Sequence, residues 1–173
     1  MAIKKNKFKW VYRSSGLKKE RVPSFYREQG ILDGVARIMI RRGVDTQDKL
    51  EHFLYDTLDN LTDPFLMKGM EEAVTRIQRA INQKEKIVIY GDYDVDGITS
   101  TAILVRYLMR ENAEVSFYIP SREEEGYGLN QMAIEKLAKA GNRLLVTVDC
   151  GISSADLVAN SPSSMDIIIT DHH

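Results

Sequence analysis

A chain of 173 residues can hold one domain, or one domain and part of another. Its 43% apolar and 28% charged residues are typical of a globular protein, and the net charge of −1 gives no overall signal for nucleic-acid or membrane binding. No apolar run reaches the roughly 18 residues that span a bilayer, and the start lacks the apolar core of a signal peptide. The single cysteine, Cys150, cannot form an internal disulfide, so we expect a cytoplasmic protein in a reducing compartment.

Residues 1–22 form a basic segment, with eight lysines and arginines against one acidic residue. Phe8, Trp10 and Tyr12 alternate with the basic residues, as in a short strand with one apolar face. Basic and aromatic side chains can bind phosphates and bases, whereas charged termini are commonly solvated and loosely attached. We favour a solvated basic arm, and a nucleic-acid contact is the alternative.

Residues 23–85 are expected to form a helical segment. Apolar residues recur at helical spacing before Gly43, which is expected to end the first long helix. Residues 45–48 offer an N-cap for a second helix, and a third helix follows the turn signal Asp63-Pro64.

From residue 86 onward, short apolar runs alternate with helical patterns. We expect strands at 87–91, 114–119, 143–148 and 166–170 and helices at 98–111, 129–140 and 153–160. Short, β-branched apolar runs are typical of buried parallel strands. Their alternation with helices predicts an α/β fold with a doubly wound, mostly parallel sheet. Neither the dinucleotide-binding nor the P-loop glycine motif is present.

Three acidic clusters follow the ends of predicted strands. Residues 91–97 read GDYDVDG after the first strand, Asp149 follows the third, and residues 171–173 read DHH after the last. Because ligands gather at the carboxyl ends of parallel strands, we expect these side chains to meet at one edge of the sheet. Carboxylates beside two histidines favour a divalent-metal site.

Within the first cluster, Asp92, Asp94 and Asp96 are spaced two residues apart. An extended chain would place them on one face, where their mutual repulsion would favour a bound cation. Residues 99–101 are expected to cap the helix that follows. The alternative is that these aspartates only solvate a loop and cap the helix, and the two other clusters favour the metal site over it.

The three clusters resemble motifs I, II and III of the DHH phosphoesterase superfamily, at residues 91–97, 148–151 and 171–173. The resemblance implies that residues 86–173 are the N-terminal part of a DHH catalytic domain that is truncated at motif III. It also implies a hydrolase with two Mn²⁺ or Mg²⁺ ions.

Two further segments narrow the resemblance. Residues 63–70 read DPFLMKGM, and residues 120–122, PSR, lead to residues 126–129, GYGL. Both are similar to the RecJ family of single-strand-specific exonucleases, which implies 5′→3′ hydrolysis of single-stranded DNA in DNA repair and recombination. Single-stranded DNA would be the substrate, and single-strand-binding protein and repair helicases are possible partners. Because that family has a further metal aspartate and further domains, this chain alone is expected to be nearly inactive.

The resemblance assigns roles to five residues of the acidic clusters. Asp94 and Asp96 would bind different metals, Asp149 would bridge them, and His172 would complete the second. His173 would lie near the scissile phosphate.

The remaining roles concern catalysis and substrate binding. Asp171 would support the histidines from behind the metal ligands. The catalytic residues would then be Asp149, Asp171 and His173. Asp92 matches no certain metal ligand of the family. Arg122 would grip a terminal 5′-phosphate and Tyr127 would lie beside the terminal nucleotide. A surface Arg122 that pairs with the glutamates at 123–125 is the alternative.

Two other functions remain open at this stage. One is a DHH phosphoesterase that acts on oligoribonucleotides or cyclic dinucleotides, against which Arg122 and residues 126–128 argue. The other is a non-enzymatic DHH-like scaffold that binds DNA or replication proteins. Retention of the metal carboxylates argues against the scaffold.

Overall fold

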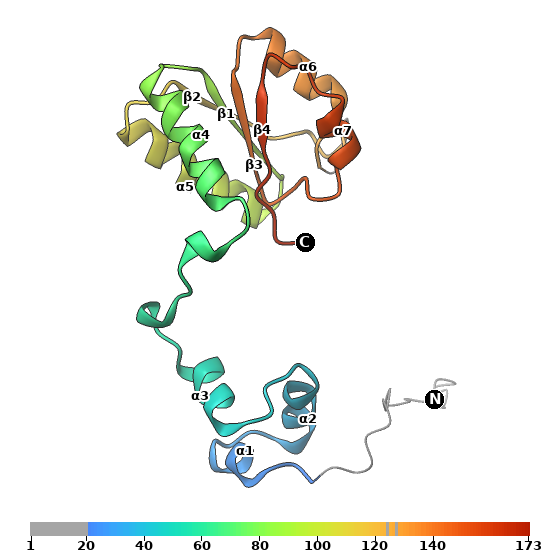
Figure 1. The fold of residues 1–173 in the computed structure, drawn as a ribbon. Coiled ribbons are helices and arrows are strands. Elements are labelled where there is room, and N and C mark those ends of the chain that lie inside the picture. The colour runs from blue at the N-terminus through green and yellow to red at the C-terminus, as the bar shows by residue number, and fades with distance from the viewer. Residues whose placement is uncertain (1–20, 124, 127) are drawn as a thin grey trace, which may run out of the picture. The chain divides into compact units, whose positions relative to one another are not determined.

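The computed structural model describes residues 21–123, 125–126 and 128–173. The predicted basic arm therefore lies outside the described residues up to residue 20, and so does Tyr127. The chain divides into two compact units, residues 1–62 and 63–173, which are considered separately (Figure 1). Over the described ranges, every helix is too short or too polar to cross a membrane.

The first unit contains three short helices, α1 (Ser24–Glu28), α2 (Asp33–Arg41) and α3 (Gln47–Tyr55), followed by the 3₁₀ turn η1 (Leu58–Asn60). The predicted stop at Gly43 is confirmed, because α2 ends at Arg41 and Gly43 has a φ of 88°. The predicted cap is confirmed as well, since the Thr46 hydroxyl accepts a hydrogen bond from the Lys49 N–H at 3.3 Å. A small core lies between these helices and comprises Val22, Tyr26, Ala36, Met39 and Leu50.

The second unit begins with η2 (Pro64–Leu66) and the helix α4 (Met70–Asn82). Alternating strands and helices follow: β1 (Ile87–Gly91), α5 (Val95–Arg110), β2 (Val115–Tyr118), α6 (Gln131–Lys139), β3 (Leu144–Val148), α7 (Ala155–Ala159) and β4 (Asp166–Ile168). Every predicted strand and helix of this region is present, and the largest shift of a start is at α5, which begins three residues before the predicted position 98.

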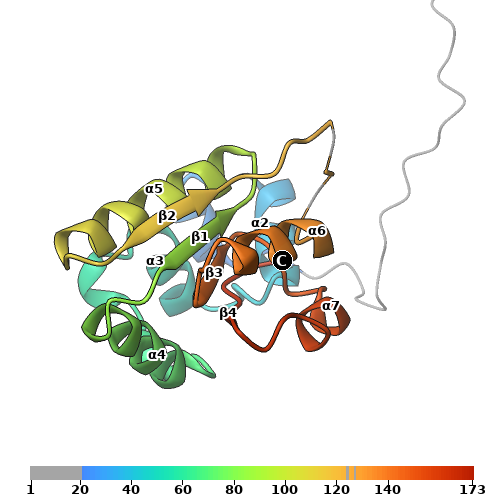
Figure 2. The ribbon, with the colours of Figure 1, turned by 90° about the horizontal axis from the view of Figure 1, so that it is seen from above.

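The four strands form a single parallel sheet in the order β2-β1-β3-β4. Helices α4 and α5 pack on one face and α6 and α7 on the other, as Figures 1 and 2 show, which confirms the doubly wound α/β fold. The chain runs from β1 to one edge of the sheet and from β3 to the opposite edge. The carboxyl ends of β1 and β3 therefore lie side by side at the switch point, where such sheets bind ligands.

Both central strands are buried along their whole length. On β1, Val88 and Tyr90 enter the core beneath α6 and α7, whereas Ile87 and Ile89 enter the core beneath α4 and α5. Burial of each such side chain contributes about 1.5–3 kcal/mol. The strand ends that carry the acidic clusters thus rest on a double-sided core.

Candidate metal centre

A tight turn joins the end of β1 to the start of α5. A Cβ on Gly97 would lie 2.6 Å from the backbone nitrogen of Asp92, and a Cβ on Gly91 would meet the side chain of Thr101. Both positions therefore require glycine, because the helix start approaches the strand end too closely for a side chain. This close approach brings the first acidic cluster onto the edge of the sheet.

Asp94 is the N-cap of α5. Its Oδ1 accepts hydrogen bonds from the backbone N–H groups of Asp96 at 2.9 Å and Gly97 at 3.0 Å. These bonds, the one from Gly97 first, lower the pKa of Asp94. The prediction that residues 99–101 cap this helix is wrong: Thr99 lies inside it, and its hydroxyl donates to the Val95 carbonyl at 2.7 Å. An aspartate is among the strongest N-cap residues, so the helix begins as soon as Asp94 is reached.

The early helix start separates Asp96 from Asp92 and Asp94, so the expectation that all three would share one face is wrong for Asp96. Asp92 is 3% exposed, Asp94 lies at the helix cap, and Asp96 is exposed on the first helical turn. Carboxylate oxygens of Asp92, Asp94 and Asp149 lie within 4.8 Å of one another, so the structure brings these three together. Among the described residues, Asp96 joins no such group of possible metal ligands.

Asp149 follows β3 in a left-handed conformation with a φ of 63°. Aspartate tolerates this conformation better than most residues. The Asp149 N–H donates to the Thr170 carbonyl at 3.1 Å, which ties the end of β3 to the chain beyond β4. Its side chain is buried, and His172 Nε2 lies 2.7 Å from Oδ1.

The third cluster forms a second group around the same carboxylate. Ligand atoms of Asp149, His172 and His173 lie within 4.8 Å of one another. The two imidazole rings stack with their centroids 4.5 Å apart. Asp149 thus belongs to both groups found in the described part of the chain, which is the position that a bridging ligand needs.

Asp171 is held by hydrogen bonds on both oxygens. Oδ2 accepts from the Ile152 N–H at 2.9 Å, and Oδ1 accepts from the N–H groups of His172 at 2.7 Å and His173 at 3.1 Å. His173 Nδ1 lies 2.6 Å from the same Oδ1. Burial opposes ionisation of Asp171, but these bonds outweigh it and lower its pKa to about 2. The Asp171 carboxylate in turn raises the pKa of His173.

Oδ1 of Asp92 is buried and has no hydrogen-bond partner among the described residues, and the buried Oδ1 of Asp149 has only the 2.7 Å contact to the exposed imidazole of His172. Buried carboxylates with so few donors are costly, and a divalent cation between them would compensate the charge. Carboxylate and imidazole ligands together suit Mn²⁺, and carboxylates suit Mg²⁺. The residues present therefore fit the metals that the sequence implies.

Arg122 contacts a residue of the first acidic segment. Its guanidinium carbon is 5.3 Å from the ring centroid of Tyr93, and Tyr93 stands between Asp92 and Asp94 in the chain. The alternative partners of Arg122 were the glutamates at 123–125. Neither Glu123 nor Glu125 forms an ion pair with Arg122, and Glu124 lies outside the described residues.

The sequence analysis missed the residues that hold the Arg122 segment. Tyr90 is fully buried, its hydroxyl donates to the Gly128 carbonyl at 3.0 Å, and Asn130 Nδ2 donates to that hydroxyl at 3.3 Å. Asn130 is also the N-cap of α6, through a bond from the Ala133 N–H at 2.7 Å. The preference of asparagine for N-caps could have identified this role, whereas no sequence signal shows what the Tyr90 hydroxyl contacts.

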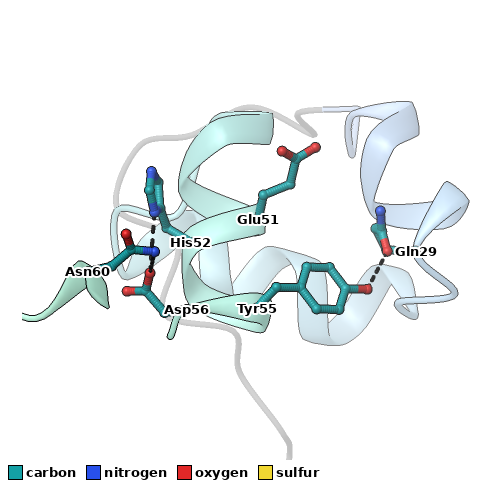
Figure 3. Close-up of a pocket in the computed structure, with 6 residues that line it drawn as sticks. All are labelled: Gln29, Glu51, His52, Tyr55, Asp56 and Asn60. Atoms are coloured by element: carbon teal, nitrogen blue, oxygen red, sulfur yellow. Dashed lines mark hydrogen bonds and ion pairs between the residues drawn. The ribbon is translucent and has the colours of Figure 1, made fainter. Parts of the chain in front are cut away.

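The first unit has a pocket of a different kind (Figure 3). Its lining side chains are Gln29, Glu51, His52, Tyr55, Asp56 and Asn60. Asp56 already accepts a hydrogen bond from Asn60 at 2.7 Å and lies 3.4 Å from His52, and Tyr55 donates to Gln29 at 2.7 Å. All six residues are exposed, so this pocket lacks buried carboxylates such as Asp92 and Asp149 of the strand-end site.

Comparisons with known proteins agree with this geometry. Residues 86–173 match the family model described as "DHH family, N-terminal domain". The chain is 43% identical over 155 residues to the single-stranded-DNA-specific exonuclease RecJ of Bacillus subtilis. The aligned region covers 89% of this chain and 20% of that protein. It is 43% identical over 108 residues to RecJ of Thermus thermophilus, covering 62% of this chain and 16% of that protein. The chain thus spans about a fifth of the length of these relatives.

Solved structures show the same likeness. A crystal structure of exonuclease RecJ bound to manganese superposes with a TM-score of 0.57 at 42% identity, covering 62% of this chain and 28% of that one. RecJ from Thermus thermophilus in complex with Mn²⁺ gives a TM-score of 0.56 at 29% identity, covering 87% of this chain and 20% of that one. The chain therefore belongs to the DHH family, and within that family it is similar to the RecJ exonucleases.

Proposed function

We propose that the protein containing this chain is a metal-dependent 5′→3′ exonuclease of single-stranded DNA that acts in DNA repair and recombination. The observation that carries the proposal is the convergence of two further carboxylates, one of them with a buried oxygen that has no partner among the described residues, and of two histidines on Asp149, at the switch point of the sheet. The similarity to exonucleases whose names specify single-stranded DNA supports the substrate class. A related structure that contains manganese supports the cofactor.

Each acidic residue has a place in this proposal. Two Mn²⁺ or Mg²⁺ ions would lower the pKa of water and neutralise charge on the phosphodiester. Asp94 and Asp96 would hold different ions, Asp149 would be shared between them, and His172 would hold the second. Asp92, which has a carboxylate oxygen within 4.8 Å of ligand atoms of Asp94 and Asp149, could hold the first ion as well.

His173 is the residue that contacts the scissile phosphate. Its pKa is raised by the Asp171 carboxylate, so a larger fraction of His173 carries a proton at neutral pH. A protonated imidazole can donate a hydrogen bond to a phosphoryl oxygen. Asp171 orients the ring through the 2.6 Å contact to Nδ1, which directs Nε2 toward the substrate.

Arg122 and Tyr127 recognise the 5′ end of the strand. A guanidinium matches the geometry of a terminal phosphate, and the proposal is supported by the contact of Arg122 with Tyr93, the residue between Asp92 and Asp94. Tyr127 stacks beside the terminal nucleotide.

Further parts of the protein complete the active site. The relatives are about four times as long as this chain, so we propose that a further metal ligand and the strand-binding domains lie in segments outside it. Single-strand-binding protein and repair helicases are the proposed partners, and the reducing cytoplasm, which suits the unpaired thiol of Cys150, is the proposed location.

The test compares the full-length gene product with Arg122→Ala on end-labelled single strands that carry a 5′-phosphate or a 5′-hydroxyl, with Mn²⁺. We expect release of mononucleotides from single strands and not from duplexes, and little release by the 173-residue chain alone. A charge-assisted contact contributes about 1.5–3 kcal/mol, so Arg122→Ala should slow the phosphorylated substrate by about tenfold to a hundredfold.

Glu123→Ala is the matched control, because this neighbouring side chain is exposed. Equal loss on both substrates in Arg122→Ala would contradict end recognition. Preferred cleavage of oligoribonucleotides or cyclic dinucleotides would contradict the DNA substrate, and full-length protein without any hydrolysis would favour a binding scaffold.

A further inference from the structure

The connection between β2 and α6, which carries Arg122, is organised by the carboxylate of Glu125. Oε1 of Glu125 accepts hydrogen bonds from the Tyr118 hydroxyl at 2.7 Å and from Asn130 Nδ2 at 3.1 Å, and Oε2 accepts from the Ser121 N–H at 2.9 Å. The backbone N–H of Glu125 donates to the Ser121 carbonyl at 2.8 Å. One side chain thus joins the end of β2, the start of the loop and the N-cap of α6.

These contacts are charge-assisted at neutral pH. The hydrogen bond from Tyr118 is the main cause that lowers the pKa of Glu125, and the same bond raises the pKa of Tyr118 to about 12. Glu125 therefore remains an anion and Tyr118 remains a neutral donor. Hydrogen bonds to an ionised acceptor are roughly twice as strong as neutral ones.

The same network reaches the strand that delivers the acidic cluster. Asn130 Nδ2 also donates to the Tyr90 hydroxyl at 3.3 Å, and the rings of Tyr90 and Tyr118 pack with centroids 5.4 Å apart. Tyr90 precedes Asp92 by two residues on the same chain segment. The connection that carries Arg122 is therefore hydrogen-bonded to β1 at Tyr90, two residues before Asp92.

Arg122 lies inside the turn that Ser121 and Glu125 close. Its side chain is exposed and long, so its reach toward the ring of Tyr93 at 5.3 Å depends on where the turn holds its backbone. Catalytic geometry tolerates little error, since a misplacement of about 1 Å can slow a reaction by about a hundredfold.

We propose that Glu125 is a positioning residue for Arg122: by holding Ser121, Tyr118 and Asn130 together, it sets where the guanidinium meets a terminal phosphate and so contributes to the selectivity for phosphorylated 5′ ends. The inference rests on the proposed exonuclease function. Glu125 itself belongs to neither group of possible metal ligands among the described residues.

The experiment measures kcat/KM of the full-length gene product on 5′-phosphorylated and 5′-hydroxyl single strands and reports their ratio. We expect Glu125→Ala to lower the ratio by about tenfold and Tyr118→Phe, which removes one donor, by about threefold. Glu123→Ala should leave the ratio unchanged. In the Arg122→Ala background, Glu125→Ala should lower the ratio no further, because its effect passes through Arg122.

Thermal unfolding of each variant separates positioning from a general loss of structure. If Glu125→Ala does not fold, Tyr118→Phe carries the test, and a lowered ratio at an unchanged Tm supports the proposal. Three outcomes would overturn it: an unchanged ratio in Glu125→Ala while Arg122→Ala lowers it, equal loss on both substrates, or effects of the two substitutions that multiply. An Arg122→Ala variant with an unchanged ratio would overturn both this inference and the end-reading role, whereas absent hydrolysis in the parent would overturn the proposed function itself.

Discussion

The ends of β3 and β4 carry two aspartates that look alike in the sequence and differ in their surroundings. Asp171, beyond β4, accepts hydrogen bonds from three backbone N–H groups and lies against His173. The buried Oδ1 of Asp149, after β3, has no backbone N–H donor among the described residues and contacts only the exposed imidazole of His172, at 2.7 Å. Backbone N–H groups fix the first carboxylate, whereas the contact of the second is a side chain that can itself bind a metal.

This difference separates two functions of a buried carboxylate. A carboxylate whose oxygens accept several N–H groups stabilises the backbone and orients a neighbour, as Asp171 does for His173. A carboxylate with an unsatisfied buried oxygen destabilises the metal-free fold and gains a partner when a cation binds. Asp92 has such an oxygen, because its Oδ1 is buried and has no partner among the described residues, and the contact of the Asp149 Oδ1 is the potential metal ligand His172. Substitutions at four aspartates test the comparison.

Asp149→Asn should have the largest effect. Loss of the carboxylate shared by both ligand groups should lower hydrolysis of phosphorylated and hydroxyl-ended strands alike, by more than about a hundredfold, which is the upper range for residues that only support a metal ligand. Asparagine tolerates the φ of 63° at this position, so the fold should persist. The measurements are nuclease assays and Mn²⁺ titration of the full-length protein, with the exposed Asp156→Asn as the control. Retention of both activities would refute the shared-ligand arrangement.

Asp171→Asn should lower the free energy of unfolding by about 2 kcal/mol, because an amide cannot accept all the hydrogen bonds of the carboxylate. Chemical denaturation in the presence of a chelator measures this effect without contributions from metal. The pKa of Asp171 is lowered to about 2, so its stabilisation is complete above the pKa of the unfolded chain, near 4, and is lost as the pH falls toward 2. The difference between wild type and variant should shrink over that interval. A difference that is constant from pH 5 to pH 2 would show that ionised Asp171 does not stabilise the fold.

Asp92→Asn should act in the opposite direction. Removal of a buried charge that lies near Asp94 and Asp149 relieves repulsion and should raise the free energy of unfolding in chelator by about 1 kcal/mol. The same substitution should weaken Mn²⁺ binding, so that added Mn²⁺ raises the Tm less than in the wild type. If the variant is less stable in chelator and binds Mn²⁺ normally, Asp92 stabilises the metal-free fold, as Asp171 does, and does not bind the metal.

Asp96→Asn should change the free energy of unfolding in chelator least, within about 0.5 kcal/mol, because its side chain is exposed. Its place in the proposed two-metal site nevertheless predicts weaker Mn²⁺ binding, which calorimetry of the full-length protein would measure. Unchanged Mn²⁺ affinity would restrict the site to the ligand groups that share Asp149.

The sequence by itself determined the architecture of the second unit. Apolar runs at β1 and β3 are long and β-branched enough to be buried on both faces, and their alternation with helices leaves a parallel sheet as the arrangement that covers both. The same pattern predicted that residues beyond the strand ends would gather at one edge, as the groups around Asp149 do.

Only the tertiary structure decided how those carboxylates divide. The sequence spacing favoured an extended run through Asp92, Asp94 and Asp96, but a helix cap at Asp94 competes with the strand for the same backbone, and the close packing at Gly97 favours the helix. The partners of Asp171 come from the loop after β3 as well as from its own neighbours, and no local pattern reveals them.

The contacts of the segment that carries Arg122 could not be predicted from the sequence either. Glu125 reads in the sequence as one of three consecutive glutamates, which is the composition of a solvated loop. Its role depends on donors from Tyr118 and Asn130, which lie on different elements of the fold. Periodicity reports which face of an element is buried, whereas hydrogen bonds between elements depend on distances that exist only after the sheet and its helices have packed.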